Sequence, residues 1–408
     1  MRSETARAAL PQRDAAIDLV RGAGILMIGI DHLEFLCEKL AGDGFINPFV
    51  TWLRIGWSGA AEFFVFFSGY LAGIVYLKTL QTHGAGMMWA RAAQRSWHIY
   101  VVNLLTLCAV LMLLRLPLLW SPEVNEASRL GALMGPQAGA AIAGFLGLQF
   151  APLYFEILNL YIVLLLLVPF VILLSRLSAG LALALSFAVW LAVQVNAAHE
   201  FAPWLGRHGN FNPFGWQFVF VLGALAGMHD VFRRLRERFP RERLFVVSGS
   251  ILLAAFVVKA VDRSGWSLPL IGAFDVPGYD KPNLGALQVA HFLVSVVFVM
   301  QIVPRTAAAL ASRPVRAVID VGRRSLECFC MSTILVYVLA ALLSRAGTFE
   351  PAALLLAGAA IVIGLCVFAR LVDWIDARPW RGARRTPKDG KEEKAQAGVD
   401  AAIVRRAA

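Results

Sequence analysis

Charged residues are scarce in this sequence. Asp, Glu, Lys and Arg make up 16% of the 408 residues, whereas 59% of the residues are hydrophobic and the mean hydropathy is +0.66. Soluble domains contain about 25% charged residues. The chain is too apolar for one soluble core and too long for one membrane anchor. The composition therefore excludes an ordinary soluble domain and predicts an all-α polytopic membrane protein.

Patterned cysteines, internal repeats and a cleavable signal peptide are also missing. The first apolar run is long and carries Arg21, Asp31 and His32, so we expect it to remain as the first span. The cysteines lack the spacing of metal sites and of disulfide frameworks, so we expect them to pack as small apolar residues and we expect no metal site. They are Cys37, Cys108, Cys328, Cys330 and Cys366.

Apolar runs of about 20 residues, the length that crosses the hydrocarbon core of a bilayer, predict about ten transmembrane helices. We expect one membrane domain over 1–375, and a basic tail over 376–408 that is too polar to fold. The predicted spans are 16–36, 56–78, 96–116, 152–175, 177–197, 214–230, 245–261, 284–304, 318–343 and 351–374.

The uneven distribution of cations predicts the orientation. If the N-terminus is cytoplasmic, the cytoplasmic side collects the run RRLRERFPRER over 233–243 and the basic tail, whereas the opposite loops hold few Lys or Arg. This asymmetry is the one that the positive-inside rule describes, so we expect both termini in the cytoplasm. Topology and anionic lipid then explain the net charge of +11 without a nucleic-acid partner.

Arg21 and His32 lie eleven positions apart in the first predicted span. Eleven steps of about 100° return a helix to within roughly 20° of its starting direction, with a rise of about 16 Å. Both side chains therefore face the same way at different depths. Such a pair favours a wet cavity enclosed by protein, although a snorkelling Arg and a hydrogen-bonded packing His would fit the same spacing.

The second predicted span, GWSGAAEFFVFFSGYLAGIVYLK, carries Glu62 and Ser68. A carboxylate at this depth must be neutral, paired or hydrated, which makes Glu62 a candidate functional residue. Gly69 and Gly73 allow a neighbouring backbone or a ligand to approach closely. The alternative is a GxxxG packing face, with Glu62 at the membrane interface.

Other polar side chains fall in later predicted spans. Glu156 must face the bundle interior of the fourth span. His291 lies about 10 Å into the eighth span and is either a functional group or a packing hydrogen bond. Four tryptophans near the expected outer interface are typical of membrane-belt anchors, although one or two could stack on a glycan ring: Trp120, Trp204, Trp216 and Trp266.

Seven segments in one order resemble the integral-membrane acyltransferase family 3 and, more closely, its relative the OpgC family of osmoregulated periplasmic glucan succinyltransferases. The tail lacks the esterase-like domain of some family-3 members, and GRRSLECFC stands where they usually show a Gly-x-x-Ser-Tyr stretch leading to a His. The OpgC branch fits better at both places. The segments are RDAAIDLVRG (13–22) with its spacing to His32, AAEFFVFFSGYLAGIVY (60–76), WARAAQRSWHIY (89–100), PLYFEILNLYIVLLLLVP (152–169), FNPFGWQFVFVLG (211–223), DKPNLGALQVAH (280–291) and VGRRSLECFCMS (321–332).

The resemblance implies a multi-pass O-acyltransferase of the bacterial inner membrane. It implies transfer of an acyl group, succinyl in the OpgC branch, from cytoplasmic acyl-CoA to a hydroxyl of a periplasmic glucan, with acyl-CoA as donor substrate and no tightly bound cofactor. His32 could take the hydroxyl proton or carry the acyl group, and Glu62 or Glu156 could orient it. The predicted catalytic residues are His32, Glu62, Glu156 and His291.

Arginines near the cytoplasmic span ends are candidates for gripping the phosphates of CoA with a bidentate guanidinium. Topology alone also places arginine at such positions, so each candidate has a structural alternative. The predicted acyl-CoA-binding residues are Arg21, Ser68, Arg91, Arg95 and Arg324.

Two other functions fit part of the pattern. An O-acetyltransferase acting on another envelope polysaccharide or on a lipid-linked sugar would use the same chemistry. A transporter or flippase would also explain the intramembrane charges. It would not explain the ordered family segments, and the sequence shows no symmetric pair of broken spans.

Overall fold

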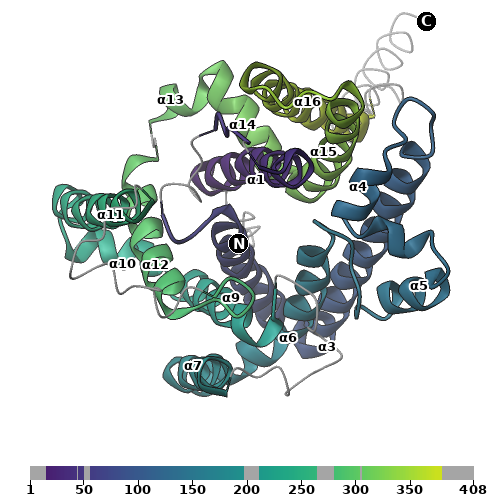
Figure 1. Ribbon diagram of the computed structural model, residues 1–408. Coiled ribbons are helices and arrows are strands. Elements are labelled where there is room, and N and C mark those ends of the chain that lie inside the picture. The colour runs from purple at the N-terminus through teal and green to yellow at the C-terminus, as the bar shows by residue number, and fades with distance from the viewer. Residues whose placement is uncertain are drawn as a thin grey trace, which may run out of the picture.

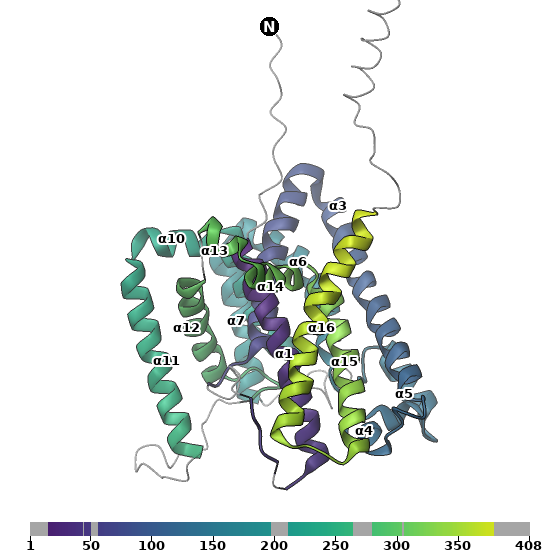
Figure 2. The same cartoon turned by 90° about the horizontal axis from the view of Figure 1, so that it is seen from above.

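The computed structural model describes residues 15–43, 45–49, 56–196, 211–263, 280–303 and 306–378. Within these ranges the regular elements are helices, as the composition predicts, and the long ones stand side by side (Figure 1). The short helices α10 and α13 lie at one end of the long helices and α4 and α5 at the other (Figure 2). We call the end with α10, whose sequence is VFRRLRER, the arginine-rich end.

The long helices follow the predicted spans. They are α1 (Ala15–Ala41), α3 (Ala60–Leu113), α6 (Glu156–Leu177), α7 (Ala179–Asn196), α9 (Pro213–Met228), α11 (Arg241–Arg263), α12 (Ala286–Ile302), α15 (Ser325–Ala346) and α16 (Pro351–Ala377). The short ones are α4 (Pro122–Ala127), the 3₁₀ helix η1 (Leu130–Leu133), α5 (Ala138–Leu146), α10 (Val231–Arg238), α13 (Ala307–Ala311) and α14 (Arg313–Arg323). Almost all of the tail over 376–408 lies outside the described residues.

Two helix boundaries differ from the prediction. α3 covers the second and third predicted spans, and Gly84, with φ of +81°, separates its two arms because glycine tolerates this backbone. The ninth predicted span begins too early. Residues 318–323 belong to the amphipathic helix α14, and Arg324 separates α14 from α15.

Five described helices are long and apolar enough to cross a membrane, namely α3, α6, α11, α15 and α16. α9 and α10, bent by 69° at their junction, form a further candidate, and α7 and α12 are shorter apolar helices. α1 has the length of a span, with 27 residues, but carries several charged side chains. The membrane class is therefore supported, while the ten crossings and the orientation stay predictions.

Glycines bring α3 and α9 into backbone contact. A Cβ atom built on Gly69 would lie 2.1 Å from the carbonyl oxygen of Phe220. Gly73 approaches α9 in the same way, and α9 contributes Gly223 and Gly227, which approach the backbone of α3. Small residues permit such contacts between membrane helices. The packing alternative for the GxxxG motif of α3 is therefore confirmed.

Replacement of Gly69 by Ala should destabilise the protein, because the added methyl group overlaps the Phe220 carbonyl. Overpacking of this kind costs about 1–3 kcal/mol. Thermal unfolding in detergent should show a lowered Tm for Gly69→Ala. Gly24→Ala on α1 is the matched control, since a Cβ there meets nothing within 4 Å. Equal Tm values for the two variants would contradict the close contact of α3 and α9.

Candidate active site

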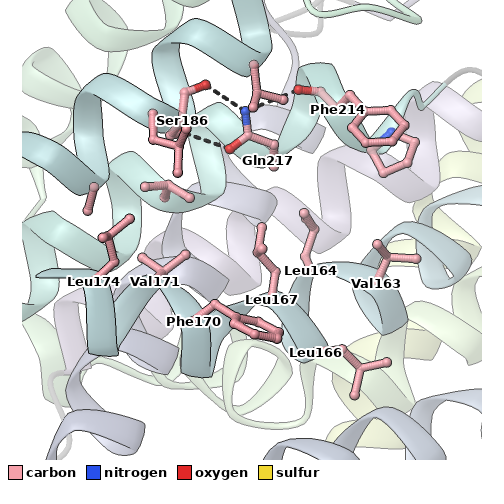
Figure 3. A pocket seen from close by; sticks show the side chains of 15 residues that line it. Val163, Leu164, Leu166, Leu167, Phe170, Val171, Leu174, Ser186, Phe214 and Gln217 are labelled. Carbon is pink, nitrogen blue, oxygen red and sulfur yellow. Dashed lines mark hydrogen bonds between the residues drawn. The ribbon is translucent and has the colours of Figure 1, made fainter. Parts of the chain in front are cut away.

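A mostly apolar cavity lies between α6, α7 and α9. It has a volume of about 460 Å³, and Figure 3 shows its walls of leucine, valine and phenylalanine. Its polar side chains, Ser186 and Gln217, satisfy each other, since the Ser186 hydroxyl donates to Gln217 Oε1 over 2.6 Å. This cavity suits an apolar chain and offers no reactive group.

A cationic cavity of about 340 Å³ lies between α1, the two arms of α3, α6 and the start of α15. Arg21, Arg91 and Arg95 line it, together with Ser68 and Tyr161, and none of its lining residues is acidic. Three guanidinium groups around one space repel each other unless an anion or water lies between them. Four of the five residues predicted to bind acyl-CoA thus line a single cavity.

Two of these arginines donate hydrogen bonds to hydroxyl groups. Arg21 donates to Ser325 Oγ over 2.5 Å, and Arg91 donates to Thr79 Oγ1 over 2.9 Å. Arg91 and Arg95 lie one turn apart on the second arm of α3 and are exposed. Their forks are therefore accessible to a phosphate-bearing ligand, which guanidinium binds through paired hydrogen bonds.

Arg324 does not line this cavity. Its Nε donates to Asp373 Oδ1 over 2.7 Å, and its Nη1 bonds Asp376. Two carboxylates of α16 thus hold the start of α15 to α16. The neighbouring Arg323 forms a 3.8 Å ion pair with Asp18 of α1. These contacts favour the structural alternative for Arg324, and its role in acyl-CoA binding stays a prediction.

His32 lies on the same helix as Arg21 and is surrounded by aromatic rings. Its imidazole stacks on Tyr154 with ring centroids 3.8 Å apart, and the Tyr154 hydroxyl donates to the His32 carbonyl over 2.6 Å. Phe329 lies edge-on at 6.1 Å. The buried Nδ1 of His32 has no hydrogen-bond partner among the described residues. Neither Glu62 nor Glu156 therefore orients the imidazole through this atom.

Two stacked rings separate Arg21 from His32. Phe64 lies 6.0 Å from the Arg21 guanidinium, Phe329 contacts His32, and the centroids of the two phenylalanines lie 6.2 Å apart. Arg21 and His32, which the spacing predicts on one face of the helix, thus both lie beside this pair of aromatic rings.

Glu156 is buried and forms a salt bridge with Arg129, which lies just before η1. Glu62 is buried at the start of α3, where its carboxylate accepts the Gly59 amide over 2.9 Å and the Gln288 side chain over 3.4 Å. Each carboxylate is therefore compensated by protein groups, as membrane depth requires. Their predicted roles beside His32 remain predictions.

His291 belongs to the contact of α12 with the segment that precedes α3. Its Nδ1 lies 2.7 Å from the Ser58 hydroxyl, and its ring meets Trp57 edge-on at 6.0 Å. A Cβ on Gly56 would lie 2.3 Å from the imidazole, so the ring is tightly enclosed. This environment favours the packing alternative that the sequence left open, and the catalytic role of His291 stays a prediction.

Lys281 joins the site although its sequence position did not single it out. It lies before α12 and is within electrostatic range of both His32 and Glu62. The backbone carbonyl of Lys281 accepts a hydrogen bond from the Nε1 of Trp216 over 3.2 Å. Trp216 itself is fully buried, so the expectation that it anchors the protein in the membrane interface is wrong. The available sequence signal for Lys281 was its place in DKPNLGALQVAH, one of the segments that resemble the OpgC family.

The comparisons with known proteins agree with the resemblance seen in the sequence. A family model described as OpgC protein matches residues 13–377. No curated protein and no solved structure matches the chain. Since the family match covers most of the 408 residues, the chain belongs to the OpgC protein family.

Proposed function

We propose that the protein is a membrane O-acyltransferase that moves an acyl group from cytoplasmic acyl-CoA to a hydroxyl of a periplasmic glucan. Membership of the OpgC family suggests a glucan-modifying acyltransferase. The observation that carries the proposal is the pairing of a cationic cavity at Arg21 with an imidazole, His32, at another depth on the same helix. This arrangement suits a donor that is bound from one side and an acceptor that arrives from the other.

The orientation follows from the charges. The arginine-rich end, with α10, is placed on the cytoplasmic face of the bacterial inner membrane, as the positive-inside rule requires. The cationic cavity then receives acyl-CoA from the cytoplasm, and Arg21, Arg91 and Arg95 bind its phosphates. The thioester reaches His32 past Phe64 and Phe329, whose apolar rings keep water from the reactive carbonyl.

In the proposed reaction His32 acts as a general base. Its neutral imidazole takes the proton of the glucan hydroxyl as the oxygen attacks the thioester carbonyl. The tetrahedral intermediate then collapses, the carbon–sulfur bond breaks, and the imidazolium returns the proton to the CoA thiolate. Tyr154 fixes the plane of the ring by stacking on it. A covalent acyl-histidine is the alternative, and it would divide the same transfer into two steps.

Lys281 favours succinyl as the group transferred. Its side chain forms no salt bridge with the described residues, yet it lies within electrostatic range of His32. A succinyl group attached at the thioester carries a free carboxylate a few bonds away from the reacting carbon. An ammonium group within electrostatic range of His32 can bind this carboxylate, whereas an acetyl group carries no charge for the ammonium group to bind.

Replacement of His32 by Ala should abolish transfer while leaving a folded protein, because loss of a general base typically lowers the rate about a hundredfold or more. Proteoliposomes supplied with radiolabelled succinyl-CoA and glucan measure the transfer, and acid-quenched protein reports any acyl-histidine. His83→Ala, at an exposed histidine, is the control. Near-normal turnover by His32→Ala would remove the central role of this residue.

Substitution of Arg21 by Lys should raise the KM for acyl-CoA by about tenfold with little change in kcat. Lysine keeps the charge but lacks the planar fork that grips phosphate. Steady-state kinetics over a range of acyl-CoA concentrations measure both constants, with Arg176→Lys, at the exposed end of α6, as the control. A lower kcat at unchanged KM would instead place Arg21 in the chemical step.

The variant Lys281→Met keeps the stem of the side chain and removes its charge. The ratio of kcat/KM for succinyl-CoA over acetyl-CoA should fall by about tenfold, the value of one charged hydrogen bond. Lys39→Met, at the exposed end of α1, is the matched control. An unchanged ratio in Lys281→Met would exclude Lys281 as the group that selects succinyl.

A further inference from the structure

A second polar cavity, of about 420 Å³, lies beside α4 and η1, away from the arginine-rich end (Figure 2). Its walls combine the indole ring of Trp120 with an amide, a carboxylate and a guanidinium, from Asn125, Glu126 and Arg129. An aromatic ring next to mixed hydrogen-bonding groups matches a sugar, whose C–H faces are apolar and whose edge carries hydroxyl groups.

Asn125, which lines the cavity, has a side-chain oxygen without a hydrogen-bond donor in the described part of the chain. The residue is only 5% exposed, and its side-chain Oδ1 accepts no hydrogen bond from any described residue. A buried amide oxygen without a donor is unfavourable, and a native structure usually supplies one. A hydroxyl group bound in the cavity would be such a donor.

Trp120 is held in place with part of its ring exposed. The Arg115 guanidinium lies 5.3 Å from the ring centroid, and the carbonyl of Trp120 accepts a hydrogen bond from Arg345 over 3.2 Å. Trp120 is nevertheless 39% exposed and lines the cavity. A rigid, partly exposed aromatic ring provides contact area at little entropic cost.

Of the four tryptophans near the expected outer interface, one remains a possible sugar platform in the described part of the chain. Trp216 is fully buried, and Trp204 and Trp266 lie outside the described residues. Trp120 is therefore the tryptophan of this group that the structure places in a polar cavity.

The cavity shares its scaffold with the reaction centre. Arg129 forms the salt bridge with Glu156, and the Leu153 amide donates to the Ser128 carbonyl over 3.0 Å. Tyr154 lies between these two contacts in the sequence and stacks on His32. α4 also packs directly against α1. A ligand in this cavity thus lies on the same rigid segment that positions the imidazole.

We propose that the cavity formed by Trp120, Asn125, Glu126 and Arg129 is a binding subsite for the acceptor glucan. The inference rests on the proposed function for the identity of the acceptor. Trp120 stacks on one glucose ring, Asn125 accepts a hydrogen bond from a hydroxyl group, and the chain continues past Arg129 toward His32. The subsite holds a unit next to the acylated one, so it contributes to acceptor affinity and not to the chemical step.

Two variants test the subsite in the full-length protein in nanodiscs. Trp120→Ala removes the platform, and Asn125→Leu removes the amide without changing its volume greatly. Binding of a neutral gluco-oligosaccharide is measured by calorimetry, and transfer from succinyl-CoA is measured separately. We expect the Kd and the KM for the oligosaccharide to rise about tenfold in each variant, with kcat and the KM for succinyl-CoA unchanged. Trp97→Ala, at an exposed tryptophan of α3 outside the cavity, is the control.

Thermal stability separates binding from folding. Because Asn125 Oδ1 accepts no internal hydrogen bond, Asn125→Leu should keep or raise the Tm while it weakens oligosaccharide binding. Unchanged Kd values in both variants, with binding by the unmodified protein intact, would overturn the subsite and leave the proposed function standing. Oligosaccharide binding that depends on Trp120 without any acyl transfer would support the subsite and overturn the proposed function. Absence of oligosaccharide binding to the unmodified protein would overturn the subsite.

Discussion

The backbone contact between α1 and α14 sets the depth of the polar groups on α1. A Cβ on Gly22 would lie 1.9 Å from the carbonyl oxygen of Val318, and one on Gly322 would lie 1.8 Å from that of Asp18. Two glycines on facing helices thus hold the backbones together, and neither helix can slide without a clash. Since α14 leads directly into α15, this contact also places Ser325 opposite Arg21. The rise along α1 separates Arg21 from His32, and this register places both residues relative to α14 and α15.

Phe64 and Phe329 fill the space between Arg21 and His32 with apolar rings. Both are buried, and their rings stack between the guanidinium of Arg21 and the ring of His32. In the proposed reaction the phosphates of acyl-CoA bind at Arg21. Beside these rings the phosphates would be costly, whereas the uncharged arm and the thioester would not. The aromatic pair can therefore admit the acyl end of the donor and exclude its phosphates. The rings would thus separate the acyl end of the donor from its phosphates by polarity, without a contact specific to the acyl group.

Local patterns predicted the helices and the face of α1, because apolar runs and the helical repeat act over a few turns. They could not predict the partners of Glu62 and Glu156, since Gln288 and Arg129 come from distant segments. Arg95 and Arg324 look alike in the sequence, as arginines near the cytoplasmic ends of predicted spans. What separates them is the presence of two carboxylates of α16 beside Arg324, which depends on how α15 and α16 pack.

The GxxxG motif of α3 is another local pattern that does not identify its partner in the fold. GxxxG indicates a close approach, but the pattern does not name the neighbour, and a ligand fitted Gly69 and Gly73 as well as a helix did. The matching pair Gly223 and Gly227 on α9 was present in the sequence as FVLGALAG. Two such motifs in one membrane protein favour pairing with each other, because each needs a surface without side chains.

The charges around the proposed reaction path complement a donor with two anionic ends. Arg21, Arg91 and Arg95 line the cavity beside Phe64, and Lys281 lies within electrostatic range of His32. Succinyl-CoA carries phosphates at one end, a carboxylate at the other and a neutral thioester between them. If each end meets its cation, the carbonyl carbon is held near His32 by contacts that lie away from the bond being broken. Binding energy from remote groups then serves to position the reacting atoms, which is how remote contacts raise a rate and not only an affinity.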